Sequence, residues 1–359
     1  MPLERIRIDR LRILEDVDCR LHPERNYFFG PNGAGKTSLL EAIHLLGRGR
    51  SFRTRQTKRL VQHGRETLAV FAELQVGGEA HRVGVSFGSA GLEYRIDRRP
   101  GASVTELARL LRVDVIDPGI HKLIEGGPSE RRRFLDWGVF HVEHNYLDQW
   151  KRFRRVLGQR NAALKARAEA SALAAWSHAL AEPAVAVDDA RRRYTVQLAA
   201  AAKEIGGRLL GQPLTVEYRR GWRSGVSFIE ALEESAERDR AFGHTQIGPH
   251  RADLFVTAGD GALSEEASRG QQKLAAAALV IAQVRVAAST GDRNGTLLVD
   301  DPAAELDRAA LGRLMMELEG LPSQLILTAL SRELLPPDER FPVFHVEQGR
   351  VERCYNASI

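Results

Sequence analysis

Hydrophobic and polar positions divide the chain into three regions, and the first has the pattern of short strands around two helices. Up to about Ile116, apolar residues alternate with polar ones or form short continuous runs, which is typical of β-strands. The segments after Lys36 and near Val104–Leu111 have helical spacing instead. The expected strands are Glu4–Ile8, Asn26–Phe29, Leu68–Val76, His81–Phe87 and Leu92–Ile96.

The second region has a helical pattern. Pro128 and Glu130 suit the first turn of a helix, because proline fits there and an acidic side chain stabilises its positive end. Apolar residues then recur every three to four positions, and an Ala-rich helix is expected from Val185 to Leu210, after Pro183. Two long helices joined by a break predict an antiparallel arm, which would reach roughly 60 Å if about 40 residues ran straight.

The third region, after about Arg240, returns to alternating strands and helices. Such alternation favours an α/β fold. The expected strands are Ala252–Thr257, Thr296–Val299 and Gln324–Thr328, the expected helices are Gln271–Ala288 and Leu306–Leu318, and Gly259-Asp260-Gly261 is expected to form a turn.

A glycine-rich loop links the expected strand Asn26–Phe29 to the helix after it. Its sequence has the glycine and lysine spacing of a phosphate-binding loop, in the strand–loop–helix context that this motif requires. The glycines let backbone N–H groups converge on phosphate oxygens at the positive end of the helix. Lys36 is expected to reach the β- and γ-phosphates of ATP, and Thr37 to bind Mg²⁺. The expected nucleotide-binding residues here are Gly30, Pro31, Asn32, Gly33, Ala34, Gly35, Lys36, Thr37 and Ser38.

An apolar strand ends in two acidic residues, Asp300 and Asp301. A buried strand with a carboxylate at its end orients the Mg²⁺ shell in such enzymes, so Asp300 is expected on the metal side. Asp301 is then placed to polarise the attacking water. An apolar run followed by Asp-Asp is more often a plain turn. Ala304-Glu305-Leu306-Asp307 follows directly, however, and resembles the loop that communicates between facing ATPase subunits.

A third motif, Ser268-Arg269-Gly270-Gln271, stands at an expected helix start. Alone it could be a plain N-cap, because serine caps helices well. Together with the other two motifs, in this order, it resembles the signature that ABC-type ATPases place on the nucleotide of a facing subunit. Ser268, Gly270 and Gln271 are therefore expected to contact the ATP that a second copy of the chain holds.

The phosphate loop lies in the first region and the acidic strand in the third, so these two regions must fold together. We expect an ATPase head made from residues 1–120 and 241–359, with a helical arm of residues 121–240 inserted between them. The expected fold class is α/β, a P-loop ABC/SMC-like ATPase head with an inserted, mainly helical arm lobe. The expected catalytic residues are Lys36, Asp301 and Ser268.

Charge is unevenly distributed along the chain. The net charge is +5, with the basic surplus in the first two thirds and an acidic last third. Basic residues crowd the segment after the phosphate-loop helix, which favours a DNA-facing loop that contacts phosphates regardless of sequence. The run Arg131–Arg133 has two open interpretations, bracing of the arm or phosphate contact. The expected DNA-facing residues are Arg48, Arg50, Arg53, Arg55, Lys58 and Arg59.

Composition argues against a membrane protein. The chain is 43% hydrophobic and 28% charged, and its longest apolar run, Leu274–Ala282, is too short to span a bilayer. Cys19 and Cys354 are the only cysteines, and the N-terminus lacks the pattern of a secretory signal. We therefore expect two reduced thiols in a cytoplasmic protein.

Six motifs in a fixed order indicate which kind of ABC/SMC-like ATPase the chain is. They are Gly49–Arg53, Gly127–Trp137, Arg160–Leu164, Gly248–Leu254, Ser268–Gln271 and Asp300–Asp307. Over nearly the whole length, this series resembles the RecF family of bacterial DNA replication and repair proteins. Three places depart from the wider ABC pattern. Ala267 replaces a common leucine, Thr328–Leu330 has no switch histidine, and Ile116–Pro118 stands where a glutamine loop is usual.

The resemblance implies a head like that of SMC proteins with a short helical second lobe. It implies that ATP and Mg²⁺ drive dimerisation and DNA binding, that hydrolysis is slow and DNA-stimulated, and that release follows hydrolysis. It further implies work with RecO and RecR proteins, which load recombinase onto gapped DNA, and support of DNA replication and the SOS response to DNA damage.

Two other functions stay open from the residues. The chain could be an ATP-gated DNA-binding adaptor with negligible turnover, although Asp301 favours real hydrolysis. It could also be the nucleotide subunit of an ABC transporter, although the inserted arm and the missing switch histidine argue against that function.

Overall fold

The computed structural model describes residues 3–259, 261–291, 295–304, 306–336 and 338–354. Its contacts divide the chain into two compact units, the first made of Met1–Ile120 and Ala288–Ile359 and the second of His121–Ala287. The sequence predicted a return to the head near residue 241, whereas the division falls after Ala287. Residues 241–287 belong with the second unit because their strand pairs with a strand at the end of the long helix.

The first unit contains a six-stranded sheet in the order β15-β14-β3-β13-β12-β8. Five of its strands are parallel, and only β15 runs antiparallel to its neighbour. Because parallel strands are covered on both faces, they read as continuous apolar runs, and β12 and β13 are buried at every position. The strands are β3 (Arg25–Phe29), β8 (Arg112–Ile116), β12 (Gly295–Asp300), β13 (Gln324–Ala329), β14 (Val343–Glu347) and β15 (Arg350–Cys354).

A second, antiparallel sheet of the first unit has the order β2-β1-β4-β5-β6-β7. Its strands alternate buried and exposed residues, which is typical of a sheet with one face on a core and one in water. They are β1 (Leu3–Leu11), β2 (Leu14–Arg20), β4 (Leu68–Val76), β5 (Glu79–Gly88), β6 (Gly91–Ile96) and β7 (Arg99–Pro100).

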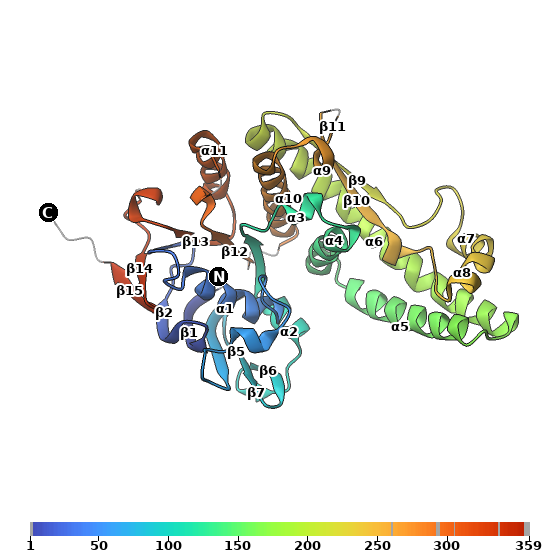
Figure 1. Cartoon of the computed structure of the whole chain (residues 1–359), viewed down its shortest axis with the longest axis horizontal. Helices are drawn as coiled ribbons and strands as arrows, with labels where there is room; N and C mark the ends of the chain where they lie inside the picture. The colour runs from blue at the N-terminus through green and yellow to red at the C-terminus, as the bar shows by residue number, and fades with distance from the viewer. Residues whose placement is uncertain (1–2, 260, 292–294, 305, 337, 355–359) are drawn as a thin grey trace. The chain divides into compact units, whose positions relative to one another are not determined.

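Helix α1 (Lys36–Arg48) lies in the core of the first unit (Figure 1). One cluster of buried side chains joins Leu40 and Ile43 of this helix to residues of both sheets, such as Val70 and Ile326. Packing on all sides explains why 11 of the 13 residues of this helix are buried, the polar Lys36, Glu41 and His44 among them. The other helices of this unit are α2 (Val104–Leu110) and α11 (Arg308–Glu319), with 3₁₀ turns at Thr57–Leu60, Pro302–Ala304 and Arg332–Leu334.

The second unit is mainly helical, with a three-stranded sheet in the order β11-β10-β9. Its central pair is the long helix α6 packed along α5, which a short connection makes antiparallel (Figure 1). The helices are α3 (Lys122–Glu125), α4 (Pro128–Val142), α5 (Tyr146–Lys165), α6 (Ala170–Leu210), α7 (Phe228–Glu234), α8 (Ala236–Phe242), α9 (Leu263–Glu266) and α10 (Arg269–Ser289), whose end crosses into the first unit. The strands are β9 (Leu214–Arg219), β10 (Asp253–Ala258) and β11 (Gly261–Ala262), with a 3₁₀ turn at Pro249–Arg251.

The helical arm differs from its sequence pattern in one respect. The pattern predicted a helix that begins after Pro183, but α6 begins at Ala170 and runs through this proline for 41 residues. A proline inside a helix removes one backbone hydrogen bond, and a long helix packed along its length against α5 tolerates that loss. The expected turn at residues 259–261 includes Asp260, which lies outside the described residues.

Within the described part of the chain, no helix is both long and apolar enough to cross a membrane. Cys19 and Cys354 are free thiols. Burial raises the pKa of the Cys19 thiol to about 12, so this side chain behaves as a small apolar group of the core.

Candidate nucleotide-binding site

The loop between β3 and α1 has the backbone of an anion-binding loop. Gly33 and Gly35 have φ angles of 80° and 118°, a region that residues with a Cβ atom rarely adopt. A Cβ on Gly35 would also lie 2.9 Å from the Leu14 side chain. Among the described residues no side chain caps the start of α1, and no acidic residue lies in its first turn. The first N–H groups and the positive end of the helix therefore face the loop unopposed.

Lys36 is folded over this loop. Its Nζ donates hydrogen bonds to the carbonyl oxygens of Gly30 at 2.6 Å and Pro31 at 3.1 Å. Desolvation lowers the pKa of Lys36, and the carboxylates of Asp301 and Asp300 oppose that shift. The ammonium group is thus held in the loop, with two acids near enough to influence it.

Asp300 ends β12 and is connected to the phosphate loop. The Thr37 hydroxyl donates to the Asp300 carboxylate at 2.9 Å, and the Thr328 hydroxyl donates to it at 2.9 Å from β13, the strand between β12 and β3. Burial raises the pKa of Asp300, and the hydrogen bonds from Thr328 and Thr37 oppose this shift. The two residues that the sequence assigned to Mg²⁺, Thr37 and Asp300, therefore lie in direct contact.

Asp301 is held in an unusual backbone conformation. Its φ angle is 43°, and its N–H donates to the Thr328 hydroxyl at 3.0 Å. Its Oδ1 atom is buried and makes no hydrogen bond to any described residue. Burial raises the pKa of Asp301, whereas Lys36 lowers it. A buried carboxylate oxygen with no partner is costly, and such an oxygen marks a place where a ligand or water binds.

A buried carboxylate that sequence reasoning missed lies beneath the basic loop. Glu41 of α1 is fully buried and accepts a hydrogen bond from the Ser51 hydroxyl. Its carboxylate also forms an ion pair with Arg12 at 2.5 Å and with Arg53 at 3.6 Å. Arg53 in turn helps to lower the pKa of Asp300. The only sequence signal for this cluster is a glutamate between apolar residues, in Leu39-Leu40-Glu41-Ala42-Ile43.

The signature motif lies in the second unit, at the start of α10. The Ser268 hydroxyl accepts a hydrogen bond from the Gln271 N–H at 3.3 Å, and the Gln271 side chain accepts one from the Ser268 N–H at 3.0 Å. This reciprocal pair is a capping box. Ser268 is exposed. The N-cap geometry therefore coexists with a serine that a second molecule can reach.

The segment after Asp301 is described only in part. Glu305 lies outside the described residues, and Asp307 caps α11 by accepting a hydrogen bond from the Ala310 N–H at 2.8 Å. At the usual place of the switch histidine, Thr328 binds Asp300 and Asp301. This threonine is a site residue whose role the sequence pattern did not assign. A hydroxyl residue at the end of a buried strand was the available signal.

The basic segment Arg48–Arg59, which starts at the last residue of α1, contains residues of two kinds. Arg50, Arg53, Arg55, Lys58 and Arg59 are exposed. Arg48 is different, since its side chain is 15% exposed, donates to the Val113 carbonyl oxygen at 2.9 Å and pairs with Asp114. Desolvation lowers the pKa of Arg48 to about 9. Arg48 is therefore a structural residue of the core, and the expectation that it faces DNA does not fit its burial.

The run Arg131–Arg133 braces the second unit internally. Arg131 forms two parallel hydrogen bonds of 2.8 Å to the Asp253 carboxylate, and Arg132 donates to the Ala252 carbonyl oxygen. Both contacts tie α4 to the start of β10. Of the two interpretations of this run, these contacts support the structural one for its first two residues.

Comparisons with known proteins place the chain in a family. The family model described as RecF/RecN/SMC N terminal domain matches residues 2–352. DNA replication and repair protein RecF of Thioalkalivibrio sulfidiphilus is 42% identical over 354 residues, which cover 97% of this chain and 98% of that protein. The protein of the same name from Chromohalobacter salexigens is 39% identical and is matched over 99% of its length. This chain belongs to the RecF family.

Solved structures agree with that membership at the level of the fold. A structure of the recombination mediator protein RecF with ATP has a TM-score of 0.88 at 24% identity, and the match covers 99% of this chain and 98% of that one. An SMC head bound to the C-winged helix domain of ScpA has a TM-score of 0.64 at 16% identity, over 99% and 98% of the two chains. These likenesses confirm the expected ABC/SMC-like α/β fold, and the RecF-family relatives confirm the resemblance seen in the six motifs.

Proposed function

We propose that this chain is an ATP-dependent, DNA-binding protein of recombinational repair in the cytoplasm. In this proposal ATP binding drives two copies together on DNA, and slow, DNA-stimulated hydrolysis releases them. Membership in the RecF family of DNA replication and repair proteins supports the process. The site geometry supports the chemistry. The observation that carries the proposal is the Thr37–Asp300 hydrogen bond beside a phosphate loop at an uncapped helix start.

The residues present suit ATP and Mg²⁺. Backbone N–H groups of the loop and the Lys36 ammonium would hold the phosphates, as in other P-loop proteins. The Thr37 hydroxyl and the Asp300 carboxylate are oxygen donors, the kind that Mg²⁺ prefers, and they already lie 2.9 Å apart. Bound there, Mg²⁺ would neutralise charge on the phosphate oxygens.

Asp301 is the proposed general base. Its buried Oδ1 has no hydrogen-bond partner among the described residues, so it can accept a hydrogen bond from a water molecule. Burial raises the pKa of Asp301, which makes the carboxylate a better proton acceptor, while Lys36 opposes that shift. The proton of the attacking water would pass to this oxygen.

A complete site needs a second copy of the chain. The first unit is the proposed ATPase head and holds Lys36, Asp300 and Asp301, whereas Ser268 belongs to the second unit. We propose that Ser268, Gly270 and Gln271 of one copy contact the γ-phosphate held by the other. RecO- and RecR-type repair proteins are the proposed partners, with recombinase loading at gapped DNA and support of the SOS response as the outcome.

The proposal is tested first through Lys36. We expect Lys36→Ala to weaken ATP binding by at least about tenfold, because the variant has no ammonium group to bind the phosphates, and so to abolish ATP-dependent dimerisation. Sedimentation velocity with and without ATP measures the dimer fraction. Lys58→Ala, which removes an exposed lysine of the same unit, is the matched control and should dimerise like the parent. An ATP-dependent dimer in Lys36→Ala at parental ATP concentrations would refute the role given to this lysine.

Asp301 distinguishes an ATPase from an adaptor with negligible turnover. Asp301→Asn keeps the shape of the side chain but removes the base, so single-turnover hydrolysis should slow by about 10²–10⁴-fold while ATP affinity is retained. If parent and variant hydrolyse ATP at the same residual rate, the adaptor function is correct and Asp301 is not a base.

A further inference from the structure

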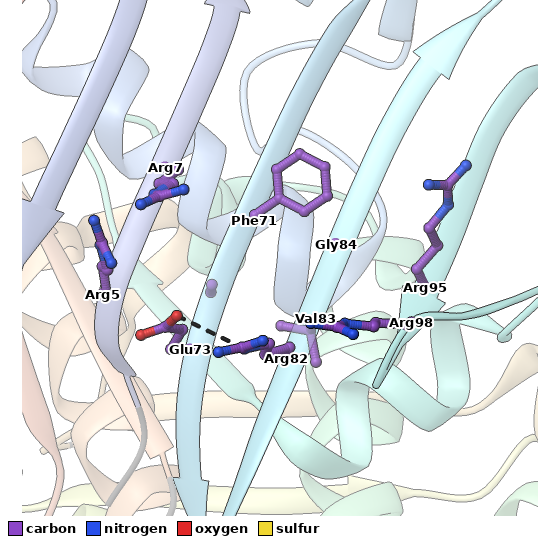
Figure 2. A pocket seen from close by; sticks show the side chains of 10 residues that line it. Arg5, Arg7, Phe71, Glu73, Arg82, Val83, Gly84, Arg95 and Arg98 are labelled. Atoms are coloured by element: carbon purple, nitrogen blue, oxygen red, sulfur yellow. Dashed lines mark ion pairs between the residues drawn. The ribbon is translucent and has the colours of Figure 1, made fainter.

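The outer face of the antiparallel sheet carries an aromatic ring between arginines. Register places Arg7 of β1 opposite Phe71 of β4, Phe71 opposite Gly84 of β5, and Gly84 opposite Arg95 of β6. One row across four strands therefore reads arginine, phenylalanine, glycine, arginine. Figure 2 shows Arg7 on one side of the ring and Arg95 on the other.

Gly84 has no side chain, and this leaves room for the Phe71 ring. A Cβ atom on Gly84 would lie 2.7 Å and 2.8 Å from two ring carbons, so the ring lies across the neighbouring strand where any other residue would displace it. Phe71 is 44% exposed, which is unusual for so large an apolar side chain on a sheet. One face of the ring rests on Gly84, and the other is available to a flat ligand.

This face forms a basic concavity of about 590 Å³. Five arginines line it and Glu73 is the only carboxylate among its lining residues. The lining residues with charge are Arg5, Arg7, Glu73, Arg82, Arg95 and Arg98, and Figure 2 shows them around Phe71.

Arg5 is occupied by two parallel hydrogen bonds to the Asp18 carboxylate, at 2.7 Å and 2.6 Å, but the other arginines keep most of their binding capacity. Arg7 is 57% exposed and shares Asp18 with Arg5, at 3.0 Å. Arg95 pairs only loosely, 3.8 Å from Glu93, and is 53% exposed. Arg98 makes no ion pair within the described part of the chain. Exposed pairs of this kind are weak, so a phosphate can compete for these guanidinium groups.

We propose that this sheet face binds single-stranded DNA, with a base stacked on Phe71 and the backbone phosphates against the surrounding arginines. The inference rests on the proposed DNA-binding function and adds a site to it. A sheet that presents an aromatic ring among basic side chains suits single strands, because their bases are free to stack whereas those of a duplex are not. The one aromatic ring in the loop Arg50–Arg59, Phe52, packs against His44 and the core and is not free to stack on a base.

The test measures the affinity of the full-length protein for a fluorescein-labelled strand of thymidines, by anisotropy with ATP at several salt concentrations. Phe71→Ala should lower the affinity about tenfold and leave the salt dependence unchanged, because stacking involves no counterions. Arg7→Gln combined with Arg95→Gln should lower the affinity and also reduce the salt slope, by about 0.7 for each phosphate that the variant no longer neutralises.

Phe255→Ala is the matched control. Phe255 is 40% exposed on a strand of the second unit, but the Arg219 guanidinium lies 3.4 Å from its ring centre and covers it. The variant should bind like the parent. Phe71 replaced by photoreactive 4-azidophenylalanine should crosslink to the strand, and the same replacement at Phe255 should not, which tests the site without removing a side chain.

The outcomes separate this inference from the proposed function. If the parent binds single strands and both face variants bind equally well, the sheet face is not a DNA site, and docking of an acidic protein becomes its explanation. If the parent binds no DNA of any kind with ATP, the proposed function and the inference both fail. Loss of binding in Phe71→Ala with a parental melting curve supports the inference.

Discussion

Two groups of arginines, one in each unit, behave in opposite ways, although they look alike in the sequence. In the second unit, Arg160 and Arg191 are each 2% exposed and fully engaged. Arg160 donates to Asp239 at 2.7 Å and to Ser177, and Arg191 donates to Asp136 at 2.8 Å. In the first unit, Arg55 and Arg59 are exposed. The number of basic residues in a segment therefore does not predict a DNA-binding surface. The guanidinium group of a buried arginine that is paired with a carboxylate is not available to bind a phosphate.

The largest effect should come from the buried pair. Arg160→Ala leaves the Asp239 carboxylate, which is fully buried, without its cation, and we expect a loss of about 3–5 kcal/mol in the free energy of unfolding. Arg152→Ala on the same helix removes an exposed pair with Glu182 and should cost less than about 1 kcal/mol. Urea titrations measure both. Equal losses would remove the distinction between the two kinds of arginine.

A smaller effect should appear as acid sensitivity. His44 is buried beside Arg48, and desolvation lowers its pKa to about 3. The unfolded chain gains a proton on His44 below about pH 6.5 while the folded chain does not, so stability falls as pH drops from there towards 3. At pH 5 the loss from this group is about 2 kcal/mol.

His44→Gln isolates that contribution, because glutamine does not titrate. Unfolding free energies at pH 7.5 and pH 5 should differ less in the variant than in the parent, by the same amount. If the two proteins lose stability equally on acidification, His44 is already protonated in the folded state.

A further comparison is between Arg48, the last residue of α1, and Arg59 in the loop that follows. Arg48→Ala removes the hydrogen bond to Val113 and should cost about 1–2 kcal/mol, with only indirect effects on DNA binding. Arg59→Ala should change stability by no more than about 0.5 kcal/mol and lower the salt slope of duplex binding by about 0.9. Denaturant titration and anisotropy give both values. A reversed pattern would mean that the buried and exposed roles are assigned to the wrong residues.

Much of the fold could be predicted because local patterns and tertiary packing agree. The strands β4 and β12 and the helix α1 lie where their apolar spacing places them. The edge strand β2 was missed because its alternation is carried by charged residues, and β14 and β15 because their runs are short. The start of α6 was missed because proline was taken as a helix boundary, and only packing against α5 shows otherwise.

The site was predictable where chemistry requires particular residues at fixed spacing. The phosphate loop and Asp300 are recognisable from sequence, and their contact through Thr37 follows from parallel strand order. Glu41 and Thr328 were not assigned, because only the folded chain shows which side chains they contact. The row of Phe71 and Gly84 was invisible for the same reason, since it depends on the register of separate strands.

The order of strands around β3 determines when the phosphate loop can form during translation. β3 carries the phosphate loop, yet both of its sheet neighbours, β13 and β14, follow the whole second unit in the chain. The Val346 carbonyl lies so close behind Gly30 that a Cβ there would be only 2.0 Å away, and the Gly349 N–H donates to the Ala34 carbonyl oxygen. On the ribosome, the loop lacks these supports until residues 324–349 have emerged. A nascent chain therefore lacks a fully supported phosphate loop until β13 and β14 have been synthesised.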